Sequence, residues 1–434
     1  MAAEFAQNVP PHLDSDAVKV VLDRAHPIAS RLIEEGHRVF VVGGLVRDLH
    51  LGGGPSADVD MTTDAKPAAI KEAVAPIAED VWSQGERFGT IGCSYENVEY
   101  EITTHRADAY EPDSRKPRVE FSSAISSDLS RRDFTVNAMA IEVPDGRLID
   151  PFDGAGDLAL LRLRTPIDAT TSFSDDPLRV LRAARFIARY GLIPDDELVE
   201  AAASLAHRLE IVSAERIRDE FEKLLATDRP GAGLRFLSHI GALGHVFPEL
   251  GRVSFDLDAL VERLDRVPAR AGADRSAARR AIVVHQALGG QNKQAISTRL
   301  HGLRYSRSEQ KRTVSVAQYL AALLGDPQVE APSARRIYAA LGDEWSTVAA
   351  AVAGWGETAL VESLASTIAN LDEKEDLTDL GPELSGEVVM GLLGITSGRQ
   401  VGDALRQLVE WRLDEGPHDP AELEPRLSAW FEGR

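Results

Sequence analysis

The stretch Val39–Thr63, VFVVGGLVRDLHLGGGPSADVDMTT, decides the fold of the N-terminal part of this chain. It predicts a short apolar strand, a Gly43-Gly44 turn that opens a helix, a glycine-rich loop, and a second strand that carries Asp58 and Asp60. Alternation along a strand points these two aspartates to the same face, about two residue rises apart. We therefore expect both carboxylates to reach one divalent cation or a pair of them, and oxygen-only ligands favour Mg(II).

The glycine pair adds a second feature to this strand-helix-strand unit. Glycines let backbone N–H groups approach a phosphate closely, and the start of the following helix also favours an anion. Each feature has an ordinary alternative, because the glycines can form only a tight turn and Asp-x-Asp can be a solvated strand end or the metal-nucleotide site of a sugar transferase. The combination of the glycines, Arg47 and the two carboxylates favours phosphoryl or nucleotidyl transfer, where positioning and charge neutralisation supply most of the catalysis.

The composition of the 434-residue chain is that of a folded protein, with 44% hydrophobic and 27% charged residues. The single cysteine, Cys93, excludes an internal disulfide framework and a cysteine-based zinc site, so we expect a reducing, cytoplasmic location. Residues 1–14 have no apolar signal-peptide core and are expected to form a flexible arm. No run approaches the roughly 18 apolar residues that a membrane span needs.

The net charge of −21 argues against a protein that binds nucleic acid over its whole surface. Local basic faces remain possible, since residues 252–312 contain 13 Lys and Arg against 6 Asp and Glu. Residues 313–434 contain 8 against 21 and would repel a phosphate backbone except at specific contacts. For both segments, ordinary solvated helix faces are the alternative interpretation.

Two polar segments follow the predicted head sheet, whose Thr90–Tyr95 and Val98–Thr103 form a hairpin. Residues 106–117, RADAYEPDSRKP, are predicted to form a loop, either a surface connection or an element that moves during a reaction. In SRRDFTVNAMA, Arg132 could hold a triphosphate and Asp133 could accept from a ribose hydroxyl. The alternative is a structural Arg-Asp ion pair.

The clearest helix is SDDPLRVLRAARFIARYG, residues 174–191, with Asp176 predicted at its N-cap and Gly191 just beyond its end. Its arginines fall on one stripe, at positions 179, 182, 185 and 189. Such a stripe repels itself unless an anion or carboxylates face it, so it could hold a triphosphate. Asp176 and Arg179 at the leading turn could satisfy the edge of a nucleobase, since one accepts and the other donates hydrogen bonds.

The remainder of the chain reads as helical, from a capped helix at Ser213 to the final turn. His-Asp occurs only once, at His418-Asp419, so a metal phosphohydrolase module is not expected. We divide the chain into an arm (1–14), a head (15–165), a neck with the arginine helix (166–235), a body (236–325) and a tail (326–434).

Five motifs of the chain resemble, in the same order, those of the class II tRNA nucleotidyltransferases. This family comprises the CCA-adding enzymes and the bacterial poly(A) polymerases. The motifs are Gly43-Gly44-Leu45-Val46-Arg47-Asp48, Asp58-Val59-Asp60, Arg131-Arg132-Asp133-Phe134-Thr135-Val136-Asn137-Ala138, Asp175-Asp176-Pro177-Leu178-Arg179 and Ser213-Ala214-Glu215-Arg216-Ile217. One departure is Asp175, where the family usually has Glu. The resemblance implies an α+β fold, with a polymerase-beta-like mixed α/β head followed by an all-α neck, body and tail.

The resemblance also implies a reaction: Mg(II)-dependent, template-independent addition of C, C and A to the 3′ end of tRNA from CTP and ATP, with release of pyrophosphate. Asp58 and Asp60 would hold the metal and serve as catalytic residues. The implied nucleotide-binding residues are Gly44 and Arg47 at the phosphates, Arg132 and Asp133 at the phosphate and ribose, Asp176 and Arg179 at the base, and Arg182 and Arg185 at the triphosphate. Residues 108–117 would be the flexible element of such enzymes, and residues 252–312 the candidate tRNA contact.

Two other functions compete with CCA addition as interpretations of the sequence. A poly(A) polymerase of the same family would take ATP alone, and the acidic tail does not suit its broad range of RNA ends. A catalytically silent tRNA-binding protein is disfavoured because an unused pair of carboxylates, Asp58 and Asp60, costs stability through mutual repulsion. We expect a monomer or homodimer that does not interact with membranes.

Overall fold

The computed structural model describes residues 15–53, 58–109, 118–252, 254–269, 274–326 and 329–433. The chain divides into two compact units, Met1–Val253 and Ser254–Arg434, and each is described by itself. Residues 1–14, predicted to form an arm, and residues 110–117, within the predicted moving element, lie outside the described residues. The finer division into head, neck, body and tail stays a prediction.

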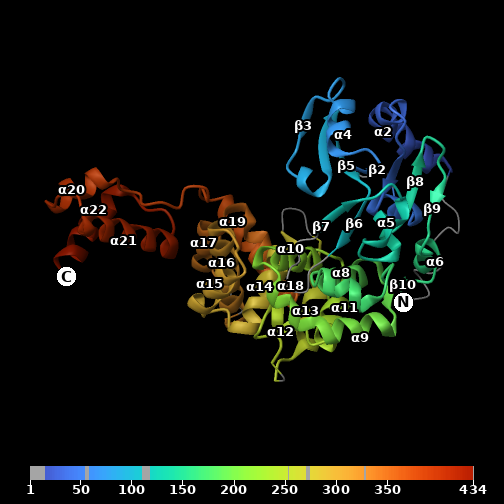
Figure 1. Cartoon of the computed structure of the whole chain (residues 1–434). Coiled ribbons are helices and arrows are strands. Elements are labelled where there is room, and N and C mark those ends of the chain that lie inside the picture. The colour runs from blue at the N-terminus through green and yellow to red at the C-terminus, as the bar shows by residue number, and fades with distance from the viewer. Residues whose placement is uncertain are drawn as a thin grey trace. The chain divides into compact units, whose positions relative to one another are not determined.

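The first unit contains a seven-stranded mixed sheet with strand order β3-β4-β5-β2-β1-β8-β9 (Figure 1). Neighbouring strands are antiparallel except for β2 and β5, which are parallel. The predicted mixed α/β head is therefore confirmed. Its strands are β1 (Val39–Val42), β2 (Asp58–Thr63), β3 (Asp80–Trp82), β4 (Thr90–Tyr95), β5 (Val98–Thr104), β8 (Ala140–Val143) and β9 (Leu148–Ile149).

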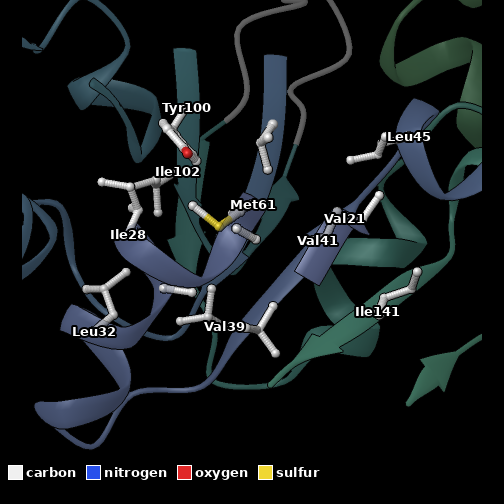
Figure 2. Close-up of a cluster of buried hydrophobic side chains, with 14 of the residues drawn as sticks. Val21, Ile28, Leu32, Val39, Val41, Leu45, Met61, Tyr100, Ile102 and Ile141 are labelled. Carbon is white, nitrogen blue, oxygen red and sulfur yellow. The ribbon is translucent and has the colours of Figure 1, made fainter. Parts of the chain in front are cut away.

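One face of this sheet is covered by apolar side chains of α2 (Ser15–Glu34) and α4 (Pro67–Val74). Figure 2 shows this cluster, in which Ile28 and Leu32 of α2 lie against Val39 and Met61 of the sheet. On the other face, α5 (Ile125–Ser130) packs on Phe40 of β1 and covers only the β1 and β8 side. On β2 the outward Asp58 and Asp60 stay exposed, and so do Glu99 and Glu101 on β5, so this end of the two strands is free to carry a site.

The hairpin between β4 and β5 forms as predicted, and its turn residues Glu96 and Asn97 have φ of 49° and 60°. The positive values fit the two-residue turns that match strand twist. The predicted loop at 106–117 is wrong at its start, because β6 (Arg106–Ala109) pairs antiparallel with β7 (Arg118–Phe121). The polar sequence gave no sign of this strand, because the strand forms by pairing with β7, which follows the turn-rich residues in the chain.

The rest of the first unit is largely helical, which agrees with the predicted architecture. Its remaining elements are α3 (Gly44–His50), η1 (Glu86–Phe88), η2 (Thr135–Asn137), α6 (Gly154–Ala159), β10 (Arg162–Leu163), α7 (Ala169–Asp175), α8 (Arg179–Tyr190), β11 (Ile193–Pro194), α9 (Asp196–Leu205), η3 (Ala206–Ile211), α10 (Ala214–Leu225), α11 (Gly231–His239) and α12 (Leu243–Val246). The short β10 and β11 pair in parallel, a detail that the helical pattern did not predict.

The start of the arginine helix differs from the prediction. Helix α8 begins at Arg179, and Asp176 is extended, with φ of −139° and ψ of 98°, at the end of α7. An extended Asp176 that accepts from the Leu178 backbone N–H still resembles a cap, and the difference is that residues 177–178 form a turn before the helix begins. Gly191 ends α8 in the left-handed conformation, as predicted.

In the second unit every described element of regular secondary structure is a helix. Its elements are α13 (Leu257–Arg266), α14 (Arg275–Leu288), α15 (Lys293–Gly302), α16 (Arg307–Gly325), α17 (Ala331–Leu341), η4 (Gly342–Glu344), α18 (Trp345–Ala353), α19 (Thr358–Asp372), α20 (Gly386–Leu393), α21 (Arg399–Glu415) and α22 (Pro420–Glu432). Within the described part of the chain, none of the helices combines the length and apolar character that crossing a membrane requires.

Part of the basic segment 252–312 is structural. Arg279 is fully buried and donates from Nε to the Leu264 carbonyl at 2.9 Å. Arg280 is also buried and donates to the Thr313 hydroxyl, while Arg312 pairs with Asp274 at 2.7 Å. The number of cations available for RNA in this segment is therefore smaller than the sequence count indicates.

Candidate active site

The glycine turn after β1 is fixed by backbone geometry and by a close neighbour. Gly43 has φ of 77°, a conformation that favours glycine. A Cβ atom at this position would lie 3.0 Å from a guanidinium nitrogen of Arg132. Gly43 therefore allows Arg132, which is far away in the sequence, to approach the turn and the neighbouring Asp60.

The two aspartates of β2 lie in register with two glutamates of β5, Asp58 with Glu99 and Asp60 with Glu101. Residues paired in this way point to the same face of a sheet. Together they line an acidic cavity of about 330 Å³ whose lining residues are Gly44, Leu45, Asp48, Asp58, Asp60, Glu99 and Glu101. Glu101 is exposed on its strand and lines this cavity together with Asp60.

The carboxylates of the acidic cavity disfavour one another's ionisation. Desolvation raises the pKa of Asp60, Arg132 opposes this shift, and the charge of Asp58 adds to it. The pKa of Glu101 is raised as well, mainly by desolvation and to a smaller extent by the charges of Asp60 and Asp58. A divalent cation would remove this repulsion, and the donors are all oxygens, so the residues fit Mg(II). The fit rests on the two aspartates, since no group of three or more His, Cys, Asp or Glu that could hold a metal ion occurs among residues whose structure is described.

A second cavity, of about 340 Å³, adjoins the acidic cavity at Gly44 and Asp60 and is rich in arginine. We call it the cationic cavity, and its lining residues are Gly43, Gly44, Asp60, Arg132, Asp133, Asn137, Asp176, Leu178, Arg179, Arg182 and Arg216. Arginine guanidinium groups match phosphate oxygens in geometry as well as in charge. Gly44 and Asp60 line both cavities, so a ligand that spans the two must pass these residues.

Buried carboxylates hold the arginines of the cationic cavity in place. Asp133 is buried and accepts from Nε of Arg182 at 2.8 Å and from Nδ2 of Asn137 at 2.9 Å. Although burial alone would raise its pKa, Arg182 and Asn137 hold the pKa of Asp133 well below its usual range. Arg132 is held instead by the fully buried Asp128, at 3.1 Å. The structural ion pair that we considered for Arg132 thus exists, but its partner is Asp128.

Two predicted nucleotide-binding residues are not on the cavity wall. Arg47 is buried behind it, where its Nη1 donates to the Asn137 side-chain oxygen at 2.6 Å and its guanidinium lies 4.5 Å from the Tyr190 ring centre. Arg185 donates to the buried Glu220 at 2.8 Å and lines a different cavity. Carboxylates therefore pair with two arginines of the stripe on α8, Arg182 and Arg185, and a direct role of Arg47 or Arg185 at a phosphate stays a prediction.

The two residues predicted to recognise a nucleobase, Asp176 and Arg179, both line the cationic cavity. Asp176 accepts from the Leu178 backbone N–H at 3.2 Å and pairs with Arg216 of α10 at 2.8 Å. Arg179 is buried and donates to the Ser172 hydroxyl at 2.5 Å. Arg216 and Asn137 lie in the quoted motifs, but the sequence pointed to no role for either. Arg216 meets Asp176, 40 positions earlier, and Asn137 accepts from Arg47, 90 positions earlier, so both contacts depend on the fold.

A mixed sheet with a glycine turn, a strand dicarboxylate and an arginine-lined cavity defines a nucleotidyltransferase head. Residues 39–164 match the family model of the poly A polymerase head domain. Residues 191–252 match the model described as the probable RNA and SrmB-binding site of polymerase A. The resemblance stated from the five motifs is therefore confirmed for the part of the chain that these models cover.

The particular relatives are CCA-adding enzymes. The chain is 40% identical over 205 residues to the CCA-adding enzyme of Lactobacillus johnsonii, an alignment that spans 47% of this chain and 50% of the relative. It is also 40% identical over 206 residues to the CCA-adding enzyme of Bacillus subtilis, and this alignment spans 47% of the present chain and 50% of the relative. The chain thus spans about half the length of these curated relatives.

The fold similarity extends further along the chain than the sequence similarity. The crystal structure of the Bacillus stearothermophilus CCA-adding enzyme in complex with CTP superimposes with a TM-score of 0.76, at 26% identity. This match covers 95% of the present chain and 98% of that one. A Thermotoga maritima CCA-adding enzyme complexed with tRNA shares the fold at 23% identity, with a TM-score of 0.61 over 99% and 98% of the two chains.

Proposed function

We propose that this protein adds C, C and A in turn to the 3′ end of tRNA, using CTP and ATP and releasing pyrophosphate. The observation that carries the proposal is that Asp60 is shared by an acidic and a cationic cavity that lie side by side. The similarity to CCA-adding enzymes supports the choice of substrates. The single, buried Cys93 suits a reducing cytoplasm, and we propose that the protein acts there as a monomer or homodimer.

The two cavities match the two halves of this reaction. The triphosphate of an incoming nucleotide suits the cationic cavity, where Arg132 and Arg182 neutralise its phosphates. Asp58 and Asp60 would hold Mg(II), which when bound lowers the pKa of the attacking hydroxyl and neutralises phosphate oxygens. The 3′ oxygen of the RNA forms a bond to the α-phosphorus of the nucleotide, and the bond from that phosphorus to pyrophosphate breaks. The proton of the 3′ hydroxyl leaves to solvent or to a nearby carboxylate such as Glu101.

Base selection is proposed for Asp176 and Arg179. Asp176 accepts hydrogen bonds and Arg179 donates them, so the pair complements a base edge that offers both a donor and an acceptor. Each is held by protein contacts, Asp176 by Arg216 and Arg179 by Ser172, which fixes its direction before a nucleotide arrives. A protein template of this kind needs no nucleic-acid template.

The proposed function predicts a defined product in a reconstituted assay. Purified protein is incubated with Mg(II) and a tRNA that ends at the discriminator base, with CTP alone, ATP alone or both. We expect two C residues with CTP alone and a single further A only when ATP is also present. Products are resolved at single-nucleotide resolution on a denaturing gel.

The same assay separates the rival functions. Long A tails with ATP alone would assign the protein to the poly(A) polymerases of the same family. Binding of the tRNA without any addition, in the presence of both nucleotides and Mg(II), would identify a silent tRNA-binding protein. Addition of two C residues without the A would show that a partner completes the end.

Replacement of Arg216 by alanine tests whether Asp176 must be held to select a base. Because Arg216 is partly exposed, its loss is expected to change the free energy of unfolding by less than about 1 kcal/mol. The preference for CTP over UTP, measured as a ratio of kcat/KM values, is expected to fall roughly tenfold. Arg218→Ala on the same helix is the matched control, because Arg218 pairs with Asp219 and does not line the cavity. An unchanged ratio in Arg216→Ala would show that Asp176 is positioned without this contact.

A further inference from the structure

Trp82 lies at the edge of the head sheet, in the same row of residues as the predicted catalytic Asp60. In this row Trp82 of β3 pairs with Gly92 of β4, Gly92 with Glu101 of β5, and Glu101 with Asp60 of β2. Paired residues share a face, so Trp82 is on the open face with the carboxylates. Two strand spacings separate Gly92 from Asp60, which is roughly 10 Å.

The indole of Trp82 lies across the backbone of Gly92. A Cβ atom on Gly92 would lie 2.0 Å from the indole Nε1 and 2.1 Å from Cε2, so no other residue leaves room for the ring. Trp82 is only partly buried, which leaves ring surface accessible beside Glu101. An aromatic ring laid on a sheet next to a catalytic row is a surface on which a nucleobase can stack.

The arrangement of the two cavities indicates which base this is. In phosphoryl transfer, the attacking and leaving oxygens lie roughly in line on opposite sides of the phosphorus. The leaving pyrophosphate belongs to the cationic cavity, so the attacking 3′ end must arrive from the acidic side, over β5 and toward β4. That side carries Asp58, Glu99 and Glu101 and repels phosphates, so it has to hold the RNA end by other means.

We propose that Trp82 stacks on the 3′-terminal base of the RNA that is being extended and thereby positions its 3′ hydroxyl at Asp60. This inference rests on the proposed function. Stacking suits the task because the terminal base changes after each addition, and an aromatic ring accepts every base while hydrogen-bond readout does not. Trp82 is a positioning residue in this scheme, and the nucleotide in the cationic cavity does not touch it.

The first test compares Trp82→Ala and Trp82→Phe in CTP addition to a tRNA that ends at the discriminator base. For Trp82→Ala we expect KM for the RNA to rise about 10- to 100-fold, with KM for CTP unchanged, and for Trp82→Phe we expect most of the loss to be recovered. A tRNA with an abasic 3′-terminal nucleotide should be a poor substrate for the wild type, and Trp82→Ala should worsen it no further. Val81→Ala is the matched control, because Val81 is on the same strand, 39% exposed and on the opposite face.

The second test keeps the tryptophan and moves it. In Gly92→Ala the new methyl group displaces the indole, so KM for the RNA should rise as in Trp82→Ala. The double variant Trp82→Ala/Gly92→Ala should be no worse than Trp82→Ala alone, since the methyl group then has room. Circular dichroism and thermal unfolding of each variant separate a lost contact from a lost fold.

The outcomes also separate this inference from the proposed function. If the wild type adds no nucleotide under any condition, the proposed function fails and the inference fails with it. If the wild type adds CCA while Trp82→Ala keeps the wild-type KM for RNA, the stacking role alone is overturned. A Trp82→Ala defect of equal size on the normal and the abasic tRNA would likewise overturn it, because the defect would not depend on the base.

Discussion

Asp60→Asn is expected to lower kcat for CTP addition by about 10³-fold or more while leaving the fold intact. The substitution keeps the size of the side chain but removes one of the two charges that would hold Mg(II), and metal-assisted charge neutralisation supplies several kcal/mol in such reactions. Single-turnover addition to tRNA with saturating CTP measures the effect. Asp145→Asn, at an exposed turn at the end of β8, is the matched control and should retain wild-type kcat.

Although Asp60→Asn is expected to lower kcat, it is not expected to lower the stability of the metal-free protein. Because the pKa of Asp60 is raised in the folded state, its contribution to stability is present below the unfolded pKa and is lost as pH rises through the folded pKa. At neutral pH, Asp60→Asn should therefore unfold at a temperature no lower than the wild type. Added Mg(II) should stabilise the wild type and not the variant. A variant that loses stability without metal would contradict the raised pKa of Asp60, which is caused by desolvation and, to a smaller extent, by the charge of Asp58.

The sequence predicted the parts of the head that depend on neighbouring residues. The Gly43-Gly44 turn, the alternation of Asp58 and Asp60, and the β4-β5 hairpin all follow from short-range rules of backbone geometry. The placement of Glu101 beside Asp60 could not be predicted in this way. It depends on the parallel register of β2 and β5, which is set by the packing of the whole sheet.

The arginine stripe shows a second limit of the sequence. Its spacing correctly predicted that carboxylates or an anion must face it, but the choice between them depends on residues distant in the chain. Asp133, 49 positions before Arg182, and Glu220, 35 positions after Arg185, reach the stripe through the fold. The capping pattern at Asp176 also did not show that a turn at residues 177–178 precedes the helix, which begins at Arg179.

Arg182→Met is expected to lower the free energy of unfolding by about 2–4 kcal/mol and to impair nucleotide addition. The variant keeps an apolar chain of similar length but leaves the buried Asp133 without its charged partner, which is costly in a site removed from water. Glu220 is less affected, because Arg185 still pairs with it at 2.8 Å. Urea unfolding followed by circular dichroism measures the loss, and KM for CTP is expected to rise because Arg182 lines the cationic cavity.

The cause of this loss has a signature in its pH dependence. The depressed pKa of Asp133 means that its stabilising contribution is present above the unfolded pKa, about 3.9, and is lost as pH falls through the folded pKa. The difference in stability between wild type and Arg182→Met should therefore narrow as pH falls below about 4, where Asp133 of the variant is protonated. The double variant Arg182→Met/Asp133→Asn should lose less free energy of unfolding than Arg182→Met alone. The control Arg189→Met, on the exposed end of the same helix, should have a free energy of unfolding within about 0.5 kcal/mol of the wild type. If the loss were the same at every pH and were not relieved in the double variant, lost packing of the arginine chain would explain it, and Asp133 would have no part in holding the cationic cavity.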